Sequence, residues 1–121
     1  MIINCPYPPS VNAAYRTFRN RVILSKVGRE YIDNFLSQFK NTFVSNSILP
    51  LKGRLRVRYD VYAPDNRRRD LANLDKLLSD CITKCGVWED DSNIDDLRFI
   101  RQPIDRENPR VIATIEELTN E

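Results

Sequence analysis

The chain has 121 residues and a formal net charge of +2, and its 41% hydrophobic and 30% charged residues are typical of a globular protein rather than a disordered one. This length supports one hydrophobic core, so we expect residues 1–121 to form a single domain. Because the sequence contains no histidine, imidazole bases and histidine metal ligands are excluded.

Charge is distributed unevenly along the chain. From Lys52 to Arg69 there are seven basic residues and two aspartates, a net +5, whereas Glu89 to Asp96 contains five carboxylates and no base, a net −5. A basic span and an acidic cluster within one small domain suit a site that holds both a polyanion and a cation.

The N-terminal region predicts a strand followed by a polar loop. Met1 to Cys5 forms a short strand, which the following prolines end because they restrict the backbone and supply no N–H. The loop from Ser10 to Arg21 is rich in side chains that commonly bind phosphate oxygens. It is either a simple connector or a DNA-contacting arm, and its candidate contacts are Asn12, Tyr15 and Arg16.

A helix and a second strand follow. Ser25 is placed to cap a helix that runs to about Lys40. Its apolar residues at helical spacing, which we expect in the core, are Val27, Tyr31, Phe35 and Phe39. From Leu55 to Val61 apolar residues alternate with Arg54, Arg56, Arg58 and Asp60. A row of guanidinium groups repels itself, so this face needs either carboxylates on a neighbouring strand or a polyanionic ligand.

Behind that strand, the arginines Arg67, Arg68 and Arg69 lead directly into Asp70. A carboxylate at this position accepts from the free N–H groups of a first helical turn, so we expect Asp70 to cap a helix. At about 100° per residue, one side of this helix is apolar and the other polar. The apolar side comprises Leu71, Leu74, Leu77, Leu78, Cys81, Ile82 and Cys85. The polar side, which is either a solvated face or part of a functional site, comprises Asn73, Lys76, Asp80 and Thr83.

The remaining chain predicts two more strands. Gly86 ends the helix because glycine readily takes a positive φ, and an acidic turn, Glu89 to Asn93, leads into a strand from Ile94 to Arg101. A last strand runs from Val111 to Leu118, and we expect these two strands to pair antiparallel. The order β-α-β-α-β-β indicates an α+β fold, a mixed β-sheet with helices packed on it.

The cysteines and the apolar segments bear on the compartment. Cys5, Cys81 and Cys85 are an odd number without the spacing of a disulfide framework, so we expect buried thiols rather than zinc ligands or a disulfide. No apolar run is long enough to cross a bilayer, and the N-terminus lacks the pattern of a signal peptide. We therefore expect a cytoplasmic protein without membrane contact.

Three blocks of the sequence resemble the RusA family of Holliday junction resolvases. They are Pro8 to Asn12, Arg67 to Lys76 and Gly86 to Asp91, in the family's order and spacing, and the resemblance covers nearly the whole chain. It implies a metal-dependent endodeoxyribonuclease that acts as a homodimer and cuts four-way DNA junctions symmetrically. The implied cofactor is Mg²⁺, with Mn²⁺ as an alternative.

The resemblance also implies roles for individual residues. It places acidic catalytic roles at Asp70 and Asp91 and a basic one at Lys76, whose ammonium would hold the scissile phosphate or stabilise the leaving oxygen. The family carries an aspartate where this chain has Ala72, which leaves a three-aspartate site incomplete. The DNA contacts implied by the central block are Arg67, Arg68, Arg69 and Asn73.

The chemistry of the residues supplies a candidate replacement. Hard divalent cations take oxygen ligands, and Mg²⁺ typically binds one or two carboxylates together with water and phosphate. Asp75 lies one helical turn beyond Ala72 and leans back over the same patch, so we expect it to replace the missing catalytic carboxylate. We predict that the carboxylates form one cluster, and its metal ligands are Asp70, Asp75, Asp90 and Asp91.

The dimer follows from the substrate. A four-way junction offers two equivalent scissile phosphates, and a chain with one acidic cluster addresses only one of them, so a two-fold homodimer is the simplest solution. The candidate interfaces are the edge strand Ile2 to Cys5 and the apolar segment Phe43 to Leu51.

Two other functions remain open. Because of Ala72, the protein is alternatively a catalytically impaired junction- or DNA-binding protein of the same fold. An RNA- or protein-binding α+β domain would use the arginine-rich strand equally well, although such a domain gains nothing from the acidic pair Asp90 and Asp91.

Overall fold

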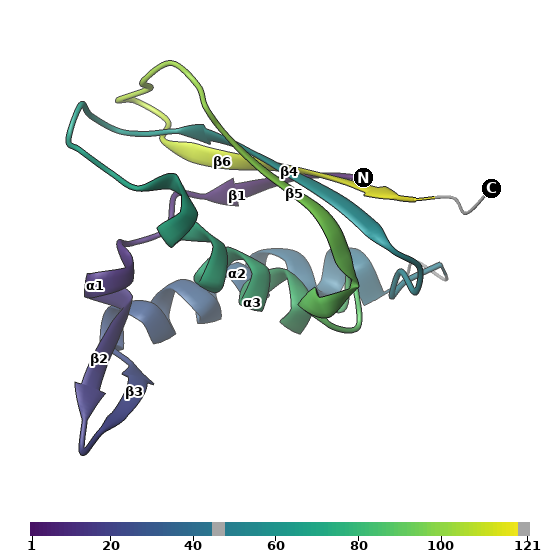
Figure 1. The fold of residues 1–121 in the computed structure, drawn as a ribbon, viewed down its shortest axis with the longest axis horizontal. Helices are drawn as coiled ribbons and strands as arrows, with labels where there is room; N and C mark the ends of the chain where they lie inside the picture. Colours follow the sequence, from purple (N-terminus) through teal and green to yellow (C-terminus); the bar gives the residue numbers. More distant parts are fainter. Residues whose placement is uncertain (45–47, 119–121) are drawn as a thin grey trace.

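Four strands form one mixed sheet, and helices cover one of its faces (Figure 1). The computed structural model describes residues 1–44 and 48–118, with the backbone alone at residues 40–44. β6 runs antiparallel to both of its neighbours, and β5 runs parallel to β4. The predicted α+β fold is therefore confirmed. In their spatial order the strands are β1 (Ile2–Pro6), β6 (Arg110–Glu117), β4 (Leu55–Tyr62) and β5 (Ile94–Arg101).

The expected pairing of the last two strands is wrong. β6 lies between β1 and β4, and β5 forms an edge of the sheet. Along β6, Val111, Ala113 and Ile115 are almost completely buried, which suits a central strand, whereas no residue of β5 is fully buried. Adjacent strands in the sequence often pair, but here the burial pattern of β6 outweighs that tendency.

Helices α2 (Lys26–Val44) and α3 (Asp75–Lys84) pack on the covered face of the sheet. The predicted cap of α2 is present, since the Ser25 hydroxyl accepts a 3.1 Å hydrogen bond from the Gly28 N–H. Within the described ranges, no helix is both long and apolar enough to cross a bilayer. The shorter elements are α1 (Val11–Ala14) and the 3-10 turns η1 (Leu71–Leu74) and η2 (Asp91–Asn93).

The core lies between the sheet and these helices. The inward residues of β4 and the apolar side of α3 are buried as predicted, and the three cysteines are buried and form no disulfide with one another. Val27 is 48% exposed, so its predicted burial is wrong. The buried residues of α2 are instead Gly28, Tyr31, Ile32 and Phe35, so at this first position Gly28 rather than Val27 faces the core.

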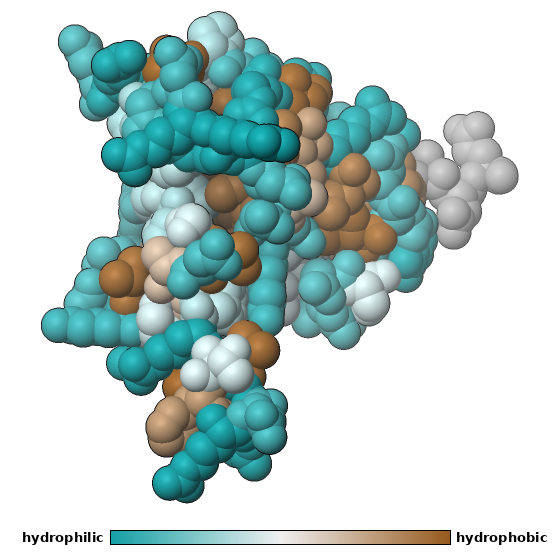
Figure 2. Space-filling view, turned by 60° about the vertical axis from the view of Figure 1, so that its left-hand side comes forward, coloured by the Kyte–Doolittle hydropathy of each residue, from teal (hydrophilic) through white to brown (hydrophobic). Residues whose placement is uncertain are grey.

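The polar loop that was expected after Ser10 is a protruding hairpin. Its strands β2 (Tyr15–Phe18) and β3 (Arg21–Leu24) form a separate antiparallel pair. The two turn residues, Arg19 and Asn20, have φ angles of 50° and 63°, the geometry that suits the twist of a two-residue hairpin. The hairpin projects below the sheet in Figure 1 and forms the lower tip of the surface in Figure 2, where hydrophobic and hydrophilic side chains alternate.

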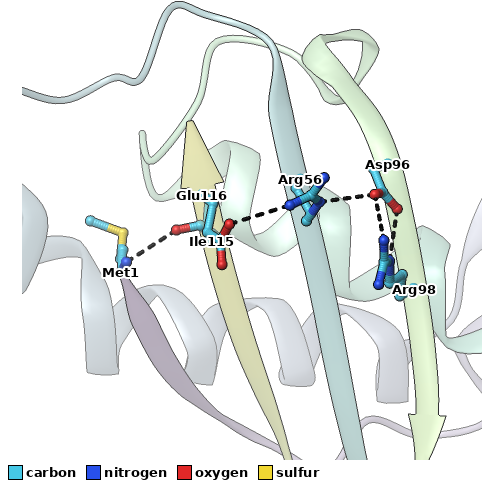
Figure 3. Close-up of polar contacts among 6 residues, drawn as sticks. All are labelled: Met1, Arg56, Asp96, Arg98, Ile115 and Glu116. Carbon is cyan, nitrogen blue, oxygen red and sulfur yellow. Dashed lines mark hydrogen bonds and ion pairs between the residues drawn. The ribbon is translucent and has the colours of Figure 1, made fainter. Parts of the chain in front are cut away.

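The arginine-bearing face of β4 is neutralised by carboxylates. Arg56 forms ion pairs with Asp96 on β5 at 2.9 Å and with Glu116 on β6 at 3.6 Å, and Arg98 joins Asp96 at 3.0 Å (Figure 3). Arg58 pairs with Asp60 on its own strand. Of the two explanations for this row of arginines, the neighbouring acidic strands are the one observed.

Candidate functional site

Two segments that are far apart in the sequence meet in a pocket of about 200 Å³. One wall comes from the loop between β1 and α1, and the other from the arginine-rich loop that precedes η1. The pocket therefore joins the first and second of the blocks identified in the sequence, and its polar lining includes Ser10, Asn12, Arg68, Arg69, Asp70 and Asn73.

Local capping interactions shape both walls. The Ser10 side chain accepts from the Ala13 N–H at 3.1 Å and starts α1. As predicted, the carboxylate of Asp70 caps the next helical segment by accepting from the Ala72 N–H at 3.2 Å. That segment begins with the tighter turn η1 rather than with α-helix, so the regular helix starts only at Asp75. The Asp70 carboxylate is thereby directed toward the backbone of the turn.

Arg69 is held in place within the protein. Its guanidinium donates to the Asp65 carboxylate at 2.6 Å and lies over the ring of Tyr7, and Arg101 donates to the Arg69 carbonyl at 2.9 Å. The Arg67 backbone N–H and the Arg69 guanidinium hold the pKa of the Asp65 carboxyl below its usual value. Arg69 therefore organises the loop.

Arg68 differs from both of its neighbours. Arg67 approaches Asp65 at 3.7 Å and Arg69 pairs with the same carboxylate, but Arg68 has no ion pair in the described part of the chain. It lines the pocket described above and also an adjoining hollow with Asp70 and Arg101. Its guanidinium is thus the one most available to a phosphate.

Lys76 contacts an aromatic ring rather than a carboxylate. Its Nζ lies 4.4 Å from the centre of the Tyr15 ring. Asp80 lies on the same polar side of α3, and burial raises its pKa above the usual value although the charge of Lys76 opposes the shift. Among the described residues Asp80 forms no ion pair with Lys76. Within the described chain, the hydroxyl of Tyr15 is buried without a hydrogen-bond partner, and the contact of this residue with phosphate stays a prediction.

An acidic group surrounds the turn before β5. Asp90 caps η2 by accepting from the Ser92 N–H, and its carboxyl group interacts with that of the neighbouring Asp91. This contact, together with burial and the charges of Asp80 and Asp75, raises the pKa of Asp91 above its usual value. The same contact lowers the pKa of Asp90. Two carboxyl groups forced together in this way form a place where a cation would relieve repulsion.

The predicted single cluster of carboxylates does not form within one chain. Among the described residues, no group of three or more acidic or cysteine side chains is arranged to hold a metal. Asp70 lies near the C-terminal end of β5, where Arg101 contacts the preceding arginine, and Asp91 lies just before its N-terminal end. The strand has eight residues and spans roughly 20–25 Å. α3 connects these two regions, and the charges of its Asp75 and Asp80 act on Asp91.

Asp75 belongs to a hydrogen-bond chain that the sequence did not reveal. The buried Ser79 hydroxyl donates to the Asp75 carboxylate at 2.7 Å and lies 3.0 Å from the hydroxyl of Tyr59, on the buried side of β4. The spacing of Asp75 and Ser79, one helical turn apart, could have predicted their hydrogen bond from the sequence. The contact of Ser79 with Tyr59 could not be predicted, because it depends on how α3 packs on the sheet. The orientation of the Asp75 carboxylate is therefore fixed by hydrogen bonds to buried residues.

Comparison with known proteins connects this arrangement to one family. The family model described as "Endodeoxyribonuclease RusA" matches residues 6–116. Two proteins named "Crossover junction endodeoxyribonuclease RusA", from Escherichia coli and Shigella sonnei, are each 38% identical to this chain over 120 residues, covering 98% of it and 96% of the relative. The protein of the same name from Enterobacteria phage 82 has the same identity and coverage. The similarity spans the pocket, α3 and the acidic turn.

Proposed function

This chain belongs to the RusA family of endodeoxyribonucleases, and we propose that it is a structure-specific enzyme that resolves four-way (Holliday) DNA junctions by symmetric phosphodiester hydrolysis. Residues 1–121 would act as one endonuclease domain. The observation that carries the proposal is the pocket in which the first two sequence blocks meet, since it places Arg68 and Asn73 beside Asp70.

The basic residues around the pocket would bind the sugar–phosphate backbone. Arg68 is the leading candidate because it is exposed and has no ion pair in the described chain, while Arg67 is exposed and only loosely paired. Arg69 would act by holding the loop in position. Asn12 and Asn73 contribute amide groups to the pocket, and Arg16 extends the basic surface onto the hairpin.

A divalent cation, Mg²⁺ or Mn²⁺, is the proposed cofactor, and the acidic turn fits it. Asp90 and Asp91 supply two adjacent carboxylates, which is the number that Mg²⁺ commonly takes from a protein. When bound, the ion would activate water and neutralise the charge that develops on the phosphate. Asp75 would add negative charge from the start of α3, and Lys76 would stabilise the leaving oxygen.

A homodimer is the proposed assembly. The two scissile phosphates of a junction are related by a two-fold axis, and two identical chains provide two identical sites. No group of three or more acidic or cysteine side chains is arranged to hold a metal among the described residues of one chain, so a second copy is the simplest source of further carboxylates. Among the candidate interfaces, β1 is an edge strand on which Ile2 is 72% exposed, and the side chain of Phe43 lies outside the described residues.

A catalytically impaired junction-binding protein is the second candidate, and Ala72 is the observation that favours it. For either function we propose a cytoplasmic location, because three buried cysteines that form no disulfide with one another suit a reducing compartment.

Incubation with a synthetic four-way junction, with and without Mg²⁺, tests the proposed function. We expect paired nicks that require the metal, no cleavage of a linear duplex with the same sequence, and loss of cleavage but not of binding in Asp91→Asn. Tight binding without any cleavage would identify the impaired junction-binding protein. Equal affinity for the junction and the linear duplex would contradict both candidates.

A further inference from the structure

The ring of Tyr15 supports the ammonium of Lys76. Tyr15 is the first residue of β2, directly after α1, and Lys76 lies in the first turn of α3. Their 4.4 Å contact is a cation–π interaction between two separate segments of the chain. We infer that Tyr15 is a positioning residue that aims Lys76 at the scissile phosphate, an inference that rests on the proposed function.

Lys76 has few other restraints. It is exposed, and within the described residues no carboxylate approaches it closely enough for an ion pair. A lysine stem has four rotatable carbons, so an unrestrained ammonium samples many positions. A ring beneath the ammonium reduces that freedom without neutralising the charge. The N–H groups that point away from the ring remain available to phosphate oxygens.

The hydroxyl of Tyr15 does not explain the presence of this residue. The oxygen is buried and has no hydrogen-bond partner in the part of the chain that the structure describes. Burial together with the charge of Asp80 raises the pKa of the phenol to about 12. A buried hydroxyl without a partner costs stability. The useful part of the side chain is therefore its ring.

The backbone around Tyr15 fixes where the ring lies. The Tyr15 N–H bonds to the Val11 carbonyl at the end of α1, and Tyr15 pairs with Leu24 across the hairpin. The next turn of chain is anchored by a 2.8 Å bond from the Ser25 N–H to the Ala14 carbonyl. A Cβ at Gly28 would clash with that carbonyl oxygen, so α2 packs tightly against the base of the hairpin. The ring is thus a fixed support.

Two substitutions separate the ring from the hydroxyl. Tyr15→Phe keeps the ring and removes the unpaired oxygen, whereas Tyr15→Leu removes the ring. Proton NMR of the Lys76 ε-methylene group reports the contact directly, because a group above an aromatic ring resonates upfield. We expect the upfield shift in the unmodified protein and in Tyr15→Phe, and its loss in Tyr15→Leu.

Single-turnover cleavage of a four-way junction reports the consequence. Tyr15→Phe should cleave within about twofold of the unmodified rate, since it preserves the support. Tyr15→Leu should cleave about ten- to a hundredfold more slowly, the scale expected for a misplaced catalytic group. Its junction affinity should change by about twofold or less, because one lysine is a small part of a polyelectrolyte interface.

The outcomes are distinct. An unmodified rate in Tyr15→Leu, or the absence of an upfield Lys76 signal in the unmodified protein, overturns the positioning role. If the unmodified protein does not cleave junctions at all, the proposed function fails, while the NMR comparison still decides whether Tyr15 holds Lys76. If Tyr15→Leu does not fold, Tyr15→Met replaces it, since methionine fills an irregular space without a ring.

Discussion

The hydroxyl of Ser79 donates a 2.7 Å hydrogen bond to the carboxylate of Asp75. Ser79 is only 2% exposed, and its oxygen also contacts the hydroxyl of Tyr59 in the core. One oxygen of Asp75 is thus held by the protein interior, so the orientation of this carboxylate is set by the packing of α3 on the sheet.

Replacing Asp75 tests whether it stands in for the carboxylate missing at Ala72. Asp75→Asn should abolish junction cleavage, because it removes a negative charge beside the acidic turn. The double change Ala72→Asp with Asp75→Asn should restore cleavage, measured as a single-turnover rate in Mg²⁺. Full activity of Asp75→Asn alone would show that the other carboxylates suffice.

Removing the Ser79 hydroxyl should destabilise the fold. Ser79→Ala leaves the buried Tyr59 hydroxyl without this partner, an effect of about 1–3 kcal/mol. Urea unfolding followed by circular dichroism measures the change. Ser37→Ala, at an exposed position on α2, is the matched control and should stay within about 0.5 kcal/mol of the unmodified protein. Equal stability of the two variants would show that the hydrogen-bond chain contributes nothing.

Arg68 should dominate the salt-dependent part of DNA binding. Arg68→Ala should weaken junction binding and reduce the slope of log affinity against log salt by about one, the change expected for one lost phosphate contact. Arg98→Ala removes the same charge from the opposite, helix-free face of the sheet, where Arg98 pairs with Asp96. Fluorescence anisotropy at several salt concentrations measures the junction affinity of the two variants. Identical slopes of log affinity against log salt for Arg68→Ala and Arg98→Ala would contradict a specific role for Arg68.

The buried thiols give a prediction about pH. Burial raises the pKa of Cys5 and of Cys81 to about 12, so their reactive thiolate form is scarce until the solution is strongly alkaline. The native protein should resist iodoacetamide at pH 8, whereas the protein in denaturant should take up label at all three cysteines. Mass spectrometry counts the labels. Rapid native labelling of Cys81 would show that α3 does not stay packed on the sheet.

The dimer is tested at its most exposed apolar positions. Ile2 on the edge strand is 72% exposed and Ile48 is 69% exposed, so a lysine at either position costs the monomer little. We expect the unmodified protein to sediment as a dimer at micromolar concentration. At least one of Ile2→Lys and Ile48→Lys should sediment as a folded monomer that nicks the two strands independently. A monomeric unmodified protein that binds one chain per junction would exclude the dimer.

The parts of the fold that the sequence predicted are those that depend on neighbouring residues. The alternation along β4, the cap at Asp70 and the positive φ of 83° at Gly86 are all local features, and all three were correct. The hairpin was missed although Asn20 favours its turn conformation, because its strands have only four residues each and bury little. The position of β6 depends on pairing between distant segments, which no local pattern specifies.

For the candidate site, too, the sequence predicted the residues but not how they are arranged in space. The sequence identified Asp70, Lys76 and Asp91 through motif blocks, but it did not show that Asp70 and Asp91 lie toward opposite ends of β5. The contact between Lys76 and Tyr15 joins segments whose proximity arises only from packing. Distance in the sequence therefore limited the prediction of geometry more than the prediction of residue identity.

The central position of β6 has a consequence for how the protein is made. Synthesis proceeds from the N-terminus, so β1, β4 and β5 leave the ribosome before the strand that lies between β1 and β4. Until Glu117 has emerged, β1 has no neighbour and β4 pairs only with β5. The surface that supports α3 is therefore completed only after nearly all of the described chain has been translated. A nascent chain tethered near DNA would lack the finished sheet and would not yet act as a nuclease.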